Sequence, residues 1–116
     1  MITVVVPTIA PRIGLLERAV RSIVAQTLPP AKVLILEDRH KDGAAATRNR
    51  ALRRVTTEWV AFVDDDDVLL PNHLKLCARY AYLSGVDVVY PGYEAVGEDP
   101  VNCFGLPFDA SLLKQR

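Results

Sequence analysis

Four consecutive aspartates, Asp64 to Asp67, are the residues whose type and spacing point most clearly to chemistry. Adjacent carboxylates repel one another, and the repulsion is strongest where a sheet edge excludes water. A divalent cation offsets it, because hard ions such as Mn²⁺ or Mg²⁺ bind carboxylate oxygens. In an extended chain Asp64 and Asp66 point to one side and Asp65 to the other. We therefore expect Asp64 and Asp66 to share a cation while Asp65 turns away.

The acidic run has a second interpretation, a solvated turn in which Asp67 or a neighbour helps to cap the helix expected to begin at Pro71. For an arbitrary acidic run this interpretation is the better one. Here the aspartates directly follow a buried apolar strand, and that position favours a ligand site. A calcium EF-hand does not fit, because its alternating ligand spacing and its glycine are missing.

Three further charged residues are candidates for ligand binding. Asp38 leaves the second expected strand, where a carboxylate can accept the imide N–H of uracil or thymine, or the N–H donors of guanine. It can equally be an ordinary turn residue that opens the loop to Gly43. Arg48 and Arg50 lie early in an expected helix, where cations oppose the helix dipole, so they indicate an anionic ligand such as pyrophosphate. At least one of them is better explained as a solvated helix charge.

The elements that position these residues alternate between strands and helices. Apolar patterning predicts strands at 2–6, 33–36, 59–63 and 86–90, and helices at 13–26, 44–55 and from 71 to about 83. This order predicts an α/β fold with three layers, α/β/α, around a mostly parallel sheet. In such sheets ligands bind outside the carboxyl ends of the strands. Residues 7–8, 37–38 and the aspartates should therefore converge on one cleft.

One domain is expected from 116 residues, with a β-α core over 1–91 and an irregular or hairpin segment over 92–116. Fourteen basic residues cancel fourteen acidic ones, so nucleic acid is not an expected partner. Two cysteines without metal-binding spacing suggest reduced thiols and a cytoplasmic location. No window approaches the roughly 20 apolar residues of a membrane span.

Five blocks, in order along the chain, resemble the GT-A glycosyltransferases of family 2, which transfer sugars from nucleotide diphosphates. The blocks are Val-Val-Val-Pro-Thr at 4–8, Ser-Ile-Val-Ala-Gln-Thr at 22–27, Glu-Asp-Arg-His-Lys-Asp-Gly at 37–43, Ala-Thr-Arg-Asn-Arg-Ala-Leu at 46–52 and Ala-Phe-Val-Asp-Asp-Asp-Asp at 61–67. The resemblance implies a GT-A, Rossmann-like fold, and a donor sugar linked to UDP, GDP or dTDP.

The resemblance also implies roles for particular residues. Pro7 and Thr8 line the base pocket, Asp38 binds the base, and 64–66 form a DxD motif in which Asp66 is the best metal ligand. The full expected nucleotide-binding set is Pro7, Thr8, Asp38, Arg48, Asn49, Asp64 and Asp65, and the expected ligands of Mn²⁺ or Mg²⁺ are Asp66 and Asp64. The loop at 37–43 departs from the family's Asp-Asp-Gly-Ser-x-Asp-Gly, which leaves the identity of the base open.

Family members invert at the anomeric carbon, and inversion needs a carboxylate base for the acceptor hydroxyl. In the family this base follows the region that resembles residues 107–109 and 112–113, so the chain is expected to be the nucleotide-sugar-binding part of a longer domain. The late carboxylates Glu94, Glu98 and Asp99 cannot be assigned the role. The expected function is metal-dependent sugar transfer, and the alternative is a non-catalytic module that binds a nucleoside diphosphate.

Overall fold

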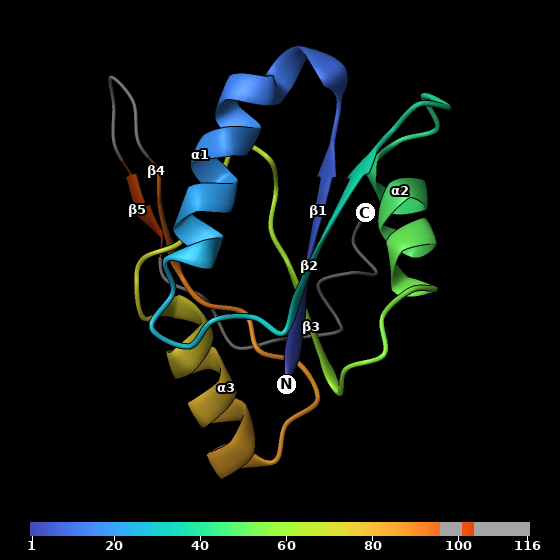
Figure 1. Ribbon diagram of the computed structural model, residues 1–116. Helices are drawn as coiled ribbons and strands as arrows, with labels where there is room; N and C mark the ends of the chain where they lie inside the picture. Colours follow the sequence, from blue (N-terminus) through green and yellow to red (C-terminus); the bar gives the residue numbers. More distant parts are fainter. Residues whose placement is uncertain (96–100, 104–116) are drawn as a thin grey trace, which may run out of the picture. The chain divides into compact units, whose positions relative to one another are not determined.

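The computed structural model describes residues 1–95 and 101–103 (Figure 1). Its elements are, in chain order, β1 (Ile2–Thr8), the 3-10 helix η1 (Ala10–Arg12), α1 (Ile13–Val24), β2 (Lys32–Glu37), α2 (Ala44–Leu52), β3 (Trp59–Phe62), α3 (His73–Ser84), β4 (Tyr93–Ala95) and β5 (Val101–Cys103). The chain divides into two compact units, Met1–Leu76 and Cys77–Arg116. The first unit holds the aspartate run.

The first unit is built on a parallel sheet with the strand order β2-β1-β3. β1 is central, and it is fully buried from Thr3 to Val6. Its apolar run buries side chains on both faces, as a strand of a parallel sheet requires. The predicted parallel sheet is confirmed, and so is the burial of its first strand.

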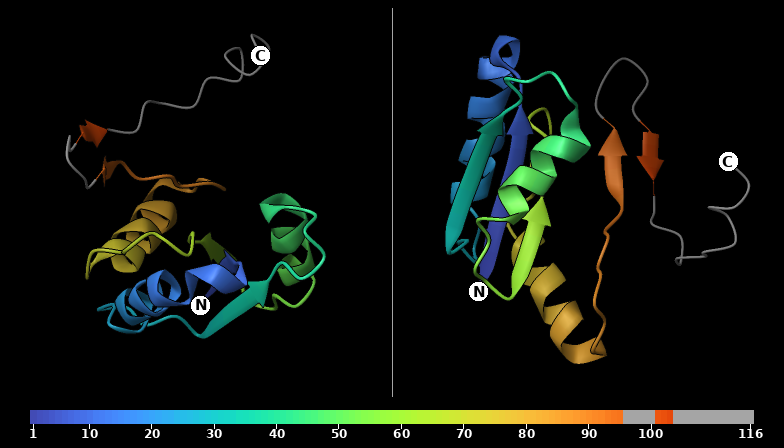
Figure 2. Two further views of the ribbon diagram at one scale, coloured as in Figure 1. Left: turned by 90° about the horizontal axis from the view of Figure 1, so that it is seen from above. Right: turned by 90° about the vertical axis from the view of Figure 1, so that its right-hand side faces the viewer.

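Alternate residues of β1 face two separate hydrophobic clusters. Val4 and Val6 pack with Ile23 of α1, and Val63 and Leu74 complete that cluster. On the opposite face, Val5 packs with Leu34 of β2 and Ala51 of α2. Figure 2 accordingly shows α1 and α2 on opposite sides of the sheet. The predicted α/β/α layering is thus present in this unit.

Strand β1 continues through Pro7 to Thr8, whereas the sequence suggested that Pro7 closes it. In a parallel strand, successive residues direct their backbone groups to alternate sides. The carbonyl of Val5 accepts a hydrogen bond from the Val63 amide at 3.0 Å, so Pro7, two residues later, has its nitrogen on the β3 side. Proline has no backbone N–H to donate, but β3 ends at Phe62 and offers no strand partner at this point. The sheet therefore loses no hydrogen bond at Pro7.

The buried side chain of Gln26 fixes the chain that follows the aspartates. Its Nε2 donates to the carbonyls of Ser22 at 3.1 Å and Leu70 at 2.6 Å, and its Oε1 accepts from the Leu74 amide at 2.9 Å. The helix predicted to reach residue 26 ends at Val24, so Gln26 lies just beyond it. From there its side chain links the end of α1 to residues 70–74.

Residues 86–90, all within the described part of the chain, form no strand, and this prediction was wrong. β-branched residues favour a strand only where a neighbouring strand supplies hydrogen bonds and packing. Val88 is instead 73% exposed. Among its described residues, the second unit contains the antiparallel pair of β4 with β5, within the segment where irregular structure or a hairpin is expected.

The helices among residues 1–95 lack the length and apolar character needed to cross a bilayer.

Candidate functional site

A pocket of about 310 Å³ lies at the carboxyl ends of the three parallel strands. Its lining residues are Pro7, Thr8, Ile9, Arg12, Asp38, Ala44, Thr47, Arg48, Asp64, Asp65 and Asp66. The three strand exits therefore converge on one cleft, as the β-α order predicts. Asn49 does not line the pocket, and its side chain is exposed on α2.

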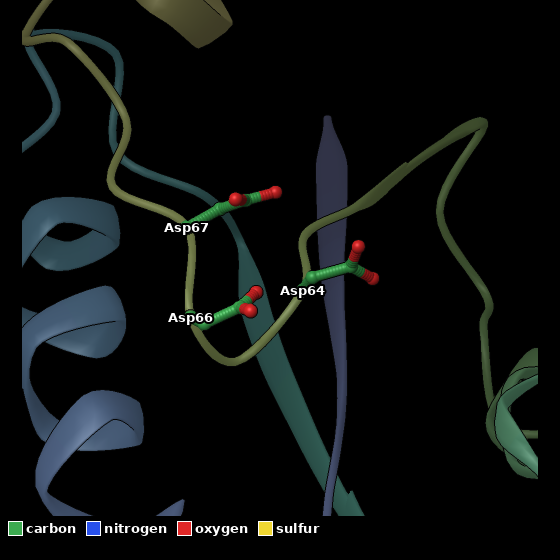
Figure 3. A group of neighbouring side chains, drawn as sticks. All are labelled: Asp64, Asp66 and Asp67. Atoms are coloured by element: carbon green, nitrogen blue, oxygen red, sulfur yellow. The ribbon is translucent and has the colours of Figure 1, made fainter. Parts of the chain in front are cut away.

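The aspartates form a tight turn after β3. The Asp67 amide donates to the Asp64 carbonyl at 3.1 Å, which closes the turn. Carboxylate oxygens of Asp64, Asp66 and Asp67 all lie within 4.8 Å of one another, and the three side chains point the same way in Figure 3. A set of three exposed carboxylates at this spacing fits a hard divalent cation. The turn, instead of an extended chain, explains why Asp67 joins the expected pair.

Asp65 turns away from this group into the protein. Its side chain is 6% exposed; its Oδ2 accepts from the Thr8 hydroxyl at 2.8 Å and its Oδ1 from Arg12 Nη1 at 3.1 Å. A buried carboxylate needs such charged and polar partners. Asp65 therefore anchors the aspartate turn to the end of β1, while its neighbours face the pocket.

Two arginines pair with aspartates of the pocket and offset part of their negative charge. Arg12 Nη1 also lies 3.6 Å from Asp66 Oδ2, and Arg48 Nη2 lies 2.6 Å from Asp64 Oδ1. Arg48 was among the residues expected here from the sequence, whereas Arg12 was not. The available signal was its position, because Arg12 ends the 3-10 helix that follows the exit of β1.

Burial raises the pKa of the Asp67 carboxyl above its ordinary value, and repulsion from Asp64, Asp66 and Asp65 adds to the shift. The raised pKa means that a negative charge on Asp67 is disfavoured in this turn. A cation bound by the carboxylates would reverse that effect.

Asp38 closes the loop between β2 and α2. Its Oδ1 accepts from the Asp42 amide at 3.2 Å and its Oδ2 from the Gly43 amide at 2.9 Å. These contacts fit the second interpretation of Asp38, an ordinary turn residue that opens the loop to Gly43. Asp38 also lines the pocket, and each of its oxygens retains a second lone pair for a ligand.

Arg50 does not line the pocket. It forms a two-point ion pair with Asp42, Nη1 to Oδ2 at 2.7 Å and Nη2 to Oδ1 at 3.1 Å. The hydrogen bond from Arg50 lowers the pKa of the Asp42 carboxyl to about 2. Of the two helix arginines, Arg48 therefore belongs to the pocket and Arg50 to the adjoining loop.

Glu94 lies in β4 of the second unit, and Glu98, Asp99 and the segments 107–109 and 112–113 lie outside the described residues.

Comparison with known proteins identifies the family. The model of glycosyl transferase family 2 matches residues 39–107, more than half of the chain. Over 71 residues the chain is 25% identical to the UDP-Glc:alpha-D-GlcNAc-diphosphoundecaprenol beta-1,3-glucosyltransferase WfgD of Escherichia coli. This match covers 61% of this chain and 28% of that protein. It is 31% identical over 100 residues to the succinoglycan biosynthesis protein ExoW of Rhizobium meliloti (strain 1021), covering 63% of this chain and 31% of that protein.

The chain thus spans less than a third of the length of these two relatives. Its parallel three-layer unit agrees with the GT-A α/β fold that the sequence predicts. On the extent of the family match, the chain belongs to glycosyl transferase family 2.

Proposed function

We propose that residues 1–116 form the nucleotide-sugar-binding part of a metal-dependent glycosyltransferase, which transfers a sugar to an acceptor hydroxyl with inversion. The observation that carries the proposal is the group of three exposed carboxylates beside two arginines, at the carboxyl ends of parallel strands. That arrangement offers ligands for a cation and donors for phosphate oxygens in one pocket.

In this proposal Asp66 and Asp64 hold Mn²⁺ or Mg²⁺, and Asp67 is close enough to be a third ligand. The bound cation would act as a Lewis acid that stabilises the charge of the departing nucleoside diphosphate. Arg48 donates to the diphosphate, and Asp65 holds the aspartate turn in place.

The remaining proposed contacts are made to the nucleoside. Asp38 accepts an N–H of the base with the lone pairs that the loop amides leave free, and Pro7 and Thr8 form the wall beside it. Asn49 stays a proposed nucleotide ligand on the strength of its sequence block alone, because it is exposed outside the pocket. UDP is the first nucleotide to test, since the E. coli relative is named for UDP-Glc, and GDP and dTDP remain candidates.

A second candidate is a module that binds a nucleoside diphosphate without turnover. The observation that favours it is that the described residues bring no further carboxylate to the pocket as a base for the acceptor. Release of UDP from UDP-glucose in the presence of Mn²⁺ and a GlcNAc-diphosphoundecaprenol acceptor would separate the two, because only a transferase would make the release depend on acceptor.

Thermal unfolding with UDP, GDP and dTDP, each with and without Mn²⁺, tests donor binding. A ligand selective for the folded state at about 100 times its Kd adds about 2.7 kcal/mol, which raises the Tm by several degrees. We expect such a rise with Mn²⁺ and at least one nucleotide, its loss in Asp66→Asn, and its retention in the control Asp87→Asn, an exposed aspartate of the second unit. No rise with any combination would contradict the proposal.

A further inference from the structure

A continuous chain of contacts leads from helix α2 to the carboxylate that faces the pocket. Arg50 binds both oxygens of Asp42, at 2.7 and 3.1 Å. The backbone amides of Asp42 and Gly43 in turn bind the two oxygens of Asp38. Arg50 Nη2 also lies 3.6 Å from Asp38 Oδ1. Arg50 thus contacts the loop 38–43 at both Asp42 and Asp38, and the amide contacts tie these two ends of the loop together.

We infer that Arg50 is a positioning residue for base recognition: through Asp42 it fixes the loop 38–43, and the loop holds the Asp38 carboxylate at the edge of the pocket. The inference rests on the proposed function, because it assumes that Asp38 meets the base. Arg50 itself does not contact the ligand, since it does not line the pocket.

The conformation of the loop explains why it needs such a support. Lys41 has a φ of 54° and Gly43 a φ of 98°, both in the left-handed region, which a residue with a side chain such as Lys41 rarely adopts. A solvated helix charge would not account for the geometry of Arg50, whose Nη2 also donates to Thr47 Oγ1 at 3.1 Å. Its side chain is only 28% exposed, and three separate groups of the loop and helix converge on it.

The test separates recognition of the nucleoside from recognition of the diphosphate. Isothermal titration calorimetry measures the Kd of UDP, GDP, dTDP and inorganic pyrophosphate, each with Mn²⁺, for the wild type and Arg50→Gln. Arg50→Lys keeps the charge but not the two-point geometry, and should give an intermediate result. Arg53→Gln changes an exposed arginine at the end of the same helix and is the matched control.

For Arg50→Gln we expect the tightest nucleoside diphosphate to bind about five- to tenfold more weakly, as loss of a positioned hydrogen bond predicts, and pyrophosphate to change by less than about twofold. Arg53→Gln should bind both as the wild type does. Equal weakening of both ligands, or no change in either, would overturn the inference.

Circular dichroism without ligand establishes that the variants are folded. If Arg50→Gln does not fold, Asp42→Asn replaces it under the same criteria, because it breaks the ion pair while keeping the backbone amides that bind Asp38. A wild type that binds none of the four ligands would refute the proposed function itself. A wild type that binds pyrophosphate as tightly as the nucleotides would leave the cation site standing and refute base recognition.

Discussion

Residues 64–67 all carry the same type of side chain, but Asp65 has different surroundings from its neighbours. Asp65 is buried and receives hydrogen bonds from Thr8 and Arg12, whereas Asp64, Asp66 and Asp67 are exposed. The buried carboxylate fixes the turn, and the exposed ones are available to a cation. This difference predicts opposite effects on stability when a hydrogen bond to Asp65 is removed and when the charge of Asp67 is removed.

Thr8→Val should lower the free energy of unfolding by about 1–3 kcal/mol, because it leaves a buried carboxylate with one donor fewer. Valine has nearly the same shape as threonine, so the hydrogen bond is the main change. Urea unfolding measures the effect, with Thr56→Val, an exposed position, as the control expected to stay within about 0.5 kcal/mol. Equal effects in the two variants would contradict the anchoring role of Asp65.

Asp67→Asn should raise stability at neutral pH without metal, by roughly 0.5 kcal/mol or less because the group is largely exposed to solvent. A carboxyl whose pKa is raised by folding lowers stability above its folded-state pKa, and this cost disappears as the pH falls below the ordinary value of 3.8. The gain should therefore be present at pH 7 and absent near pH 3, as measured by thermal unfolding. A gain that persists at pH 3 would mean that its cause is not the charge.

The sequence predicted some of these side chains and not others, for local reasons. The shared side of Asp64 and Asp66 and the opposite side of Asp65 follow from the spacing, and the structure shows both. Asp67 was missed because its contact depends on a turn that residue spacing does not reveal. Arg12 was missed because its partner is distant in sequence.

Among the elements, α1 and the start of α3 are joined by several hydrogen bonds, among them those of the buried Gln26 side-chain amide. Gln26→Leu should lower the free energy of unfolding by about 2–4 kcal/mol, because the Leu70 carbonyl and the Leu74 amide lose their partner while the volume stays similar. Thr27→Val, whose hydroxyl bonds at the exposed surface, should cost much less. Denaturation of both variants checks the difference, and similar midpoints would show that Gln26 does not hold this segment.

The elements themselves were predicted well where burial was two-sided or the helical period was long. The three strands of the sheet and the helices α1 and α2 lie within a few residues of their predicted bounds. The prediction failed where pairing decides the outcome: Pro7 stays in β1 because β3 has already ended, and the apolar residues 86–90 do not form a strand without a neighbouring one. Neither condition is visible in a local sequence window.

For the chain as a whole, charge is balanced overall but not in the pocket. The formal net charge is zero, yet the pocket is lined by two arginines, Arg12 and Arg48, against four aspartates. The excess of two negative charges opposes a bare diphosphate. We therefore expect UDP to bind at least about tenfold more weakly without Mn²⁺ or Mg²⁺ than with either, as measured by calorimetry. Affinity that does not depend on the cation would show that the arginines alone suffice.

A crystal of the protein grown with Mn²⁺ and a nucleoside diphosphate would show the site itself. We predict an anomalous manganese peak at bonding distance from Asp66, with the phosphates on the same ion and the base beside Asp38. The contrary result is a crystal grown with both Mn²⁺ and the nucleotide that lacks that peak, in which Asp64 is still paired with Arg48 and Asp66 is still beside Arg12.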